Sequence, residues 1–267
     1  MTPQATARTV RSADGTSIAF DEVGSGPAII LVDAAAGFRG FGPMGPLAAA
    51  LAPEFRVFTY DRRGRGESTD TPPYAVEREV EDLQALIEAA GGSACVYGFS
   101  SGAVLALRGA ADGLPIEKLA LMEPPLELDE HAPPERNLGA EVAELVAAGR
   151  RGDAVEHFNR SIGVPDEMIT GLRQAPSWPA LEALAHTLVY DTVITSSALT
   201  AAQLPAVTTP TLVLASGASD DRLLGWARAM SDALPNGSLR TMKGEWHGVP
   251  LEDLAPVLSE FFGEERR

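Results

Sequence analysis

Short apolar runs alternate along the chain with longer segments in which apolar positions recur every three or four residues. The short runs predict strands. A continuous run such as residues 28–32 is typical of a strand that is covered on both faces of a parallel sheet. The predicted strands span residues 17–23, 28–32, 55–60, 93–97, 118–122, 211–215 and 239–242.

The segments with helical spacing predict helices between these strands. Residues 74–90 place Val76, Val80 and Leu83 on one face, and Gly91 follows as a stop signal. The alternation of strands and helices predicts an α/β fold with a mostly parallel sheet. Further helices of this kind are expected at residues 103–110 and 251–262.

The strand pattern stops after residue 125, and only helical patterns follow as far as residue 203. An all-helical insertion between two core strands predicts a lid over a site. The sequence therefore divides into a core, residues 1–125 and 204–267, and a helical lid (cap), residues 126–203. The predicted lid helices span residues 137–148, 153–160, 166–173 and 178–187.

The segment most informative about chemistry is Gly98-Phe99-Ser100-Ser101-Gly102, which has the pattern G-x-S-x-G. It follows a predicted strand and precedes a predicted helix, the context in which this pattern forms a nucleophile elbow. Glycine and serine also form ordinary turns, so the context carries the interpretation. We predict that Ser100 is a catalytic nucleophile.

Composition and charge limit the partners and the cellular location that we expect for the protein. The formal net charge is −16, which disfavours nucleic acid and anionic membranes as partners. The single cysteine, Cys95, excludes an internal disulfide. Residues 1–10 lack a secretion signal and no apolar run has membrane-spanning length, so we expect a cytoplasmic protein. The sequence leaves open whether it is a monomer or a homodimer.

A serine nucleophile requires a base, and His247 is the only histidine late in the chain. It lies between the last predicted strand and the last predicted helix, as the order nucleophile, acid, histidine requires. We therefore predict His247 as the base. The other three histidines, His131, His157 and His186, fall in the predicted lid.

Two carboxylates compete to orient His247. Asp220 follows the strand at 211–215, but it also precedes a periodic apolar run and would cap that helix. Glu123 ends the strand at 118–122 before two prolines, where an unpartnered carboxylate would cost several kcal/mol. This burial argument favours Glu123 and leaves Asp220 as the alternative acid.

An oxyanion intermediate requires two backbone N–H donors. The residue after the nucleophile, Ser101, would supply one of them. The other is expected from the turn after the strand at 28–32, within residues 33–37, where small side chains permit close approach of the backbone.

Together these segments resemble the α/β-hydrolase superfamily, and the similarity covers nearly the whole chain. Its markers are residues 98–102, Asp61-Arg62-Arg63-Gly64-Arg65-Gly66-Glu67-Ser68, Pro210-Thr211-Leu212-Val213-Leu214 and Trp246-His247. The resemblance implies an eight-stranded, mostly parallel sheet with helices on both faces and a helical lid inserted after the sixth strand. It also implies that Ala35 supplies the second oxyanion N–H.

Two features depart from the usual pattern of this superfamily. Asp33-Ala34 stands where members usually carry His-Gly after the third strand. The usual acid position matches Asp220, whereas certain dehalogenases and zearalenone-type lactone hydrolases place a glutamate at the position of Glu123. The resemblance to the lactone hydrolases, which extends to Asp33 and to Ser-Ser-Gly at the elbow, favours Glu123 and a lactone substrate.

These observations predict a serine hydrolase that cleaves an ester or lactone of a small hydrophobic molecule, with no metal or organic cofactor. Two alternatives remain: a carbon–carbon bond hydrolase or cofactor-free peroxidase-like enzyme on the same triad, and a non-catalytic relative that binds a small molecule. The lid is expected to supply the substrate pocket, with Trp178, His186, Tyr190 and Leu126 as candidate lining residues and Trp226 beside them.

Overall fold

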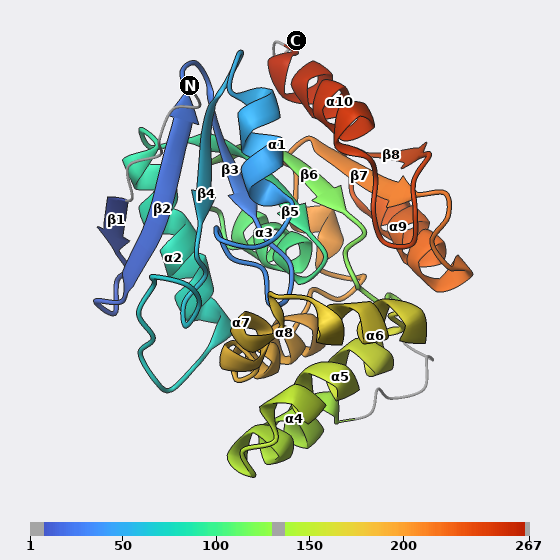
Figure 1. Ribbon diagram of the computed structural model, residues 1–267. Coiled ribbons are helices and arrows are strands. Elements are labelled where there is room, and N and C mark those ends of the chain that lie inside the picture. The colour runs from blue at the N-terminus through green and yellow to red at the C-terminus, as the bar shows by residue number, and fades with distance from the viewer. Residues whose placement is uncertain (1–7, 130–136, 265–267) are drawn as a thin grey trace.

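A central sheet of eight strands organises the chain, in the order β1-β2-β4-β3-β5-β6-β7-β8 (Figure 1). The computed structural model describes residues 8–129 and 137–264. The pairs β1–β2 and β2–β4 are antiparallel and the other five pairs are parallel. The strands are β1 (Arg8–Arg11), β2 (Ser17–Gly24), β3 (Ala28–Val32), β4 (Arg56–Tyr60), β5 (Ala94–Phe99), β6 (Ile116–Met122), β7 (Thr211–Ser216) and β8 (Gly237–Met242).

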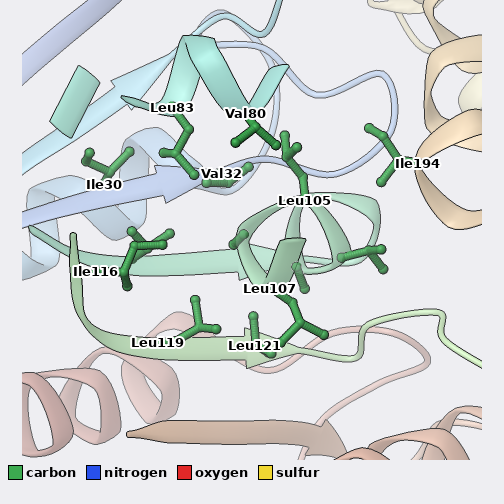
Figure 2. Close-up of a cluster of buried hydrophobic side chains, with 14 of the residues drawn as sticks. Ile30, Val32, Val80, Leu83, Leu105, Leu107, Ile116, Leu119, Leu121 and Ile194 are labelled. Carbon is green, nitrogen blue, oxygen red and sulfur yellow. The ribbon is translucent and has the colours of Figure 1, made fainter. Parts of the chain in front are cut away.

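Helices cover both faces of this sheet, which confirms the predicted α/β architecture. On one face, α2 (Val76–Ala89), α3 (Ser101–Ala111) and α9 (Asp221–Ala233) contribute to a large apolar cluster. Figure 2 shows part of this cluster, in which Leu83 and Leu105 lie between the helices and the strands. On the other face, α1 (Met44–Leu51) and α10 (Leu251–Gly263) pack on a second cluster.

Among the described residues, five helices lie between β6 and β7, and we call residues 138–196 the helical insertion. It lies beyond one end of the sheet, below the core in Figure 1. Val142, Phe158 and Leu188 belong to its own small apolar cluster. The helices are α4 (Leu138–Ala147), α5 (Arg151–Ile162), α6 (Asp166–Gln174), α7 (Trp178–Ala183) and α8 (Thr187–Ser196), and a 3₁₀ turn, η1 (Leu204–Ala206), precedes β7.

Three elements differ from the sequence-based expectation. The helix predicted at 178–187 ends at Ala183, and a separate helix, α8, begins at Thr187. Strand β1 was not predicted, because its four residues lie at the sheet edge, three of them exposed, and carry no apolar alternation. Helix α1 was not predicted either, because glycine and proline interrupt its first turn.

Candidate active site

Ser100 lies in the sharp turn between β5 and α3, with a backbone φ of 54°. A positive φ at a residue with a side chain is strained, and here it projects the serine out of the turn. The flanking glycines are required by space. A Cβ on Gly98 would lie 2.6 Å from the Cα of Ala103, and one on Gly102 would lie 2.5 Å from the carbonyl oxygen of Asp33. The turn therefore has the tight geometry, with a positive φ at Ser100 and no room for a side chain at either glycine, that is expected of a nucleophile elbow.

Glu123 and His247 meet although 124 residues separate them. The Nδ1 atom of His247 lies 2.6 Å from Oε2 of Glu123, which is fully buried at the end of β6. The other carboxyl oxygen, Oε1, accepts the backbone N–H of Ser216 at 2.7 Å. With Glu123 ionised, the hydrogen bond assigns the ring proton to Nδ1 and leaves Nε2 free to accept a proton.

Asp220, the alternative acid, has a different set of partners. It caps α9, because its Oδ1 accepts the backbone N–H of Leu223 at 2.9 Å. Its Oδ2 lies 3.7 Å from Nη2 of Arg222, and its side chain is 41% exposed. The structure therefore brings Glu123, and not Asp220, to the ring of His247.

A cavity of about 310 Å³ joins the elbow, His247 and the helical insertion. Its lining includes four of the residues expected to bear the chemistry: Ser100, His247, Ala35 and Ser101. The remaining wall combines aliphatic and aromatic side chains with four polar ones and one cation. These residues are Pro125, Leu138, Phe158, Ser161, Ile162, Asp191, Thr192, Thr195, Arg222, Leu223, Trp226 and Trp246.

Ala35 belongs to a loop that we call the oxyanion loop, residues 33–37, directly after β3. Two carbonyl groups of this loop are held by one arginine: Nη1 of Arg65 donates to Ala34 at 2.6 Å and to Gly37 at 3.2 Å. The backbone N–H of Ser101 opens α3, where a helix has no internal acceptor for it. Neither the N–H of Ala35 nor that of Ser101 has a backbone acceptor among the described residues, and both residues line the cavity.

Asp33 stands where members of the superfamily usually carry histidine, and it is almost fully buried. Its Oδ1 accepts the backbone N–H of Ala34 at 2.8 Å, whereas Oδ2 has no hydrogen-bond partner among the described residues. The loop packs tightly around the carboxyl group, since a Cβ on Gly37 would come within 2.3 Å of it. Burial raises the pKa of Asp33 from 3.8 to about 7.

The raised pKa of Asp33 predicts a pH-dependent effect of Asp33→Asn on stability. From about pH 4 to pH 7 the folded protein keeps a proton that the unfolded chain releases, so this carboxyl lowers the free energy of unfolding as the pH rises. The difference in the free energy of unfolding, variant minus wild type, should be about 2–3 kcal/mol more positive at pH 8 than at pH 5. Denaturant unfolding at both pH values measures this difference.

The control for that experiment is Asp112→Asn, which removes a side-chain carboxyl that is 37% exposed. It should change the free energy of unfolding by nearly the same small amount at both pH values. Equal effects of Asp33→Asn at pH 5 and pH 8 would show that the Asp33 carboxyl does not titrate as stated.

The four lid residues expected to line the pocket are not among the lining residues of this cavity. Trp178 packs within the insertion's own apolar cluster. His186 meets the edge of Tyr190, whose ring stacks on Tyr74 at 4.0 Å. Leu126 belongs to the main core. Trp226, by contrast, does line the cavity. Of the two other histidines of the predicted lid, His157 forms a hydrogen bond with Glu141. His131 lies outside the described residues.

The cavity instead takes its insertion residues from α4, which contributes Leu138, and from α5 and α8. Phe158, Ser161 and Ile162 share one face of α5, at the three- and four-residue spacing that identifies a helix face. Asp191 and Thr195 do the same on α8. That spacing is visible in the sequence, but it indicates a face without indicating what the face covers.

No metal site is apparent in the described part of the chain, where no group of three or more histidine, cysteine, aspartate or glutamate side chains is placed to hold an ion. Among residues 8–129 and 137–264, no helix combines the length and the apolar character needed to cross a bilayer.

Comparison with known proteins identifies the family of the chain. The model of the alpha/beta hydrolase family matches residues 29–259, and the chain belongs to that family. A crystal structure of an alpha/beta hydrolase from Sphaerobacter thermophilus is 48% identical, with a TM-score of 0.89, and the match covers 96% of this chain and all of that one.

Two esterases share the fold at lower sequence identity. One is a thermophilic esterase from Thermogutta terrifontis, which is 24% identical with a TM-score of 0.76 and 97% coverage of both chains. The other is an esterase from Exiguobacterium antarcticum, 18% identical with a TM-score of 0.75, and the match covers 97% of this chain and all of that one. At these identities the likeness concerns the fold.

Proposed function

We propose that this protein is a serine hydrolase that cleaves an ester or lactone bond of a small hydrophobic molecule. The observation that carries the proposal is the contact between Glu123 and His247 at a cavity that Ser100 also lines. A buried carboxylate on Nδ1, an imidazole with Nε2 free and a half-buried alcohol that lines the cavity at a strained turn form the combination that activates serine.

The reaction follows from these positions. The Oγ atom of Ser100 attacks the carbonyl carbon while Nε2 of His247 takes its proton. The negative oxygen is held by the N–H groups of Ala35 and Ser101. The tetrahedral intermediate then breaks its bond to the leaving oxygen, which receives the proton from His247, and an acyl-enzyme remains on Ser100. A water molecule then gives a proton to His247 and attacks the acyl carbon; the bond to Oγ of Ser100 breaks, Oγ receives that proton from His247, and the acid is released.

The cavity wall supports a hydrophobic substrate. The hydroxyl groups of Thr192 and Thr195 donate to carbonyls of their own helix, so they present little free polarity to a ligand. A volume of about 310 Å³ is near the lower end of ligand pockets and fits a short acyl or lactone group. In this proposal residues 126–203 act as the lid of a core formed by residues 1–125 and 204–267.

A panel of p-nitrophenyl esters and small lactones tests the proposal. We expect short acyl chains to be hydrolysed faster than long ones, because the cavity is small. Product analysis by mass spectrometry separates acid plus alcohol from the products of carbon–carbon cleavage or peracid formation. A Ser100→Ala sample purified in parallel reveals any contaminating esterase. Absence of turnover across the panel would favour a relative that only binds its ligand.

A further inference from the structure

A cluster of buried charges lies behind the oxyanion loop, and the proposed mechanism uses none of them. We call it the charge cluster: Arg62, Arg65, Glu79 and Asp191, each with no more than 2% of its surface exposed. Both arginines come from the segment 61–68 that follows β4. Charges buried to this degree are costly unless they are paired in good geometry, so the cluster calls for an account of its role.

Asp191 is the centre of the charge cluster. Its Oδ1 accepts Nη1 of Arg62 at 2.8 Å and its Oδ2 accepts Nη2 of Arg65 at 2.7 Å. The hydroxyl of Ser101 also donates to Oδ1, at 2.7 Å. Burial alone would raise the pKa of Asp191, but Arg65 and Arg62 outweigh it and lower the pKa, so the group is a carboxylate.

The two arginines that bind Asp191 also donate hydrogen bonds to the oxyanion loop. Arg65 donates to the carbonyls of Ala34 and Gly37, on either side of Ala35, and Arg62 donates more weakly to the carbonyl of Asp33 at 3.3 Å. Arg62 also donates two hydrogen bonds to the carboxylate of Glu79, at 2.7 and 2.8 Å. Arg65 has no such second carboxylate, and its buried Nε has no partner among the described residues.

The contact between Asp191 and Arg65 joins the helical insertion to the core. Asp191 belongs to α8 of the helical insertion, whereas Arg65, Ala35 and Ser101 belong to the core. The donors of an oxyanion hole must be fixed before reaction to be effective, and a misplacement of about 1 Å can cost about 100-fold in rate. The backbone near Ala35 is therefore held from the insertion side.

We propose that Asp191 is a positioning residue, which fixes the N–H of Ala35 through Arg65 and so makes the oxyanion hole complete only when α8 is docked on the core. The inference rests on the proposed serine-hydrolase function. It assigns to Asp191 no contact with the reacting atoms.

The test compares Asp191→Asn with Asp82→Asn. Asp82 is likewise buried and accepts two arginine hydrogen bonds, both of them from Arg63 of the same segment 61–68. Arg63 also bonds Asp14 and the carbonyl of Arg78, and not the oxyanion loop. Both variants lose a buried carboxylate and both should lower the unfolding midpoint. Only the Asp191 variant should lose reactivity per folded molecule.

The readouts are the rate of Ser100 phosphonylation by a fluorophosphonate probe and the kinetics of p-nitrophenyl acetate hydrolysis, below the unfolding temperature of each variant. We expect Asp191→Asn to lower the labelling rate and kcat by about 10- to 100-fold, with KM changed less than about threefold. Asp82→Asn should stay within about twofold of wild type in both readouts.

Each result decides the matter. If the labelling rate and kcat fall equally in the two variants, or if only KM rises, Asp191 has an ordinary structural role. Either result would leave the serine-hydrolase proposal intact. An unlabelled wild-type protein would overturn both proposals. If Asp191→Asn does not fold, Arg65→Lys decides, because a single ammonium group keeps the charge but cannot span Asp191 and both loop carbonyls; full reactivity in that variant would contradict the inference.

Discussion

The Ser100→Ala variant is expected to lose about 10⁴- to 10⁶-fold in kcat for ester hydrolysis. The loss is this large because the variant has no Oγ atom at the elbow to attack the carbonyl carbon, and His247 then has no hydroxyl there to deprotonate. The small remaining rate should come from the oxyanion donors and from substrate binding. Steady-state kinetics with p-nitrophenyl acetate measures the effect.

The fold should survive this substitution. Alanine fits the space that Ser100 occupies, so the unfolding midpoint should stay within about 4 °C of wild type. Ser231→Ala is the matched control, since it removes a serine hydroxyl that bonds the carbonyl of Arg228 on α9. Activity retained in Ser100→Ala within tenfold of wild type would refute a covalent mechanism at this residue.

Glu123→Gln is expected to lose about 10²- to 10⁴-fold in kcat. Glutamine preserves the size of the side chain and can still accept the N–H of Ser216, but it removes the negative charge beside Nδ1 of His247. The imidazolium formed during the reaction then loses its stabilisation, and the ring can adopt the wrong tautomer. Steady-state kinetics and thermal unfolding measured together separate this loss from misfolding.

Asp220→Asn is the companion variant for Glu123→Gln. Asparagine caps helices about as well as aspartate, so the α9 cap at Leu223 should persist, and kcat should change less than about threefold. A large loss of turnover in Asp220→Asn, with Glu123→Gln active, would reverse the assignment of the acid.

The parts of the site that local sequence predicts are those enforced by local geometry. The elbow requires glycine on both sides of Ser100, because a Cβ at Gly98 or Gly102 would overlap backbone atoms. The burial argument for Glu123 is also local, since the carboxylate ends an apolar strand. Its partner, His247, follows from the chain order of the residues.

The walls of the cavity could not be read from the sequence in the same way. Asp191 bonds Ser101 and Arg65, which are 90 and 126 positions away in the sequence. No pattern within α8 predicts these partners. Helical spacing identifies a face, whereas the packing of the insertion on the core decides what that face covers. For this reason the sequence points to Trp178 and Tyr190, whereas Phe158 and Asp191 line the cavity.

The most direct test of the account is covalent labelling of the wild-type protein with a fluorophosphonate probe, followed by peptide mapping by mass spectrometry. The account predicts one adduct per molecule, carried by the side chain of Ser100, and none in Ser100→Ala. An unmodified protein, or an adduct on another residue, under conditions that fully label a known serine hydrolase, would contradict it.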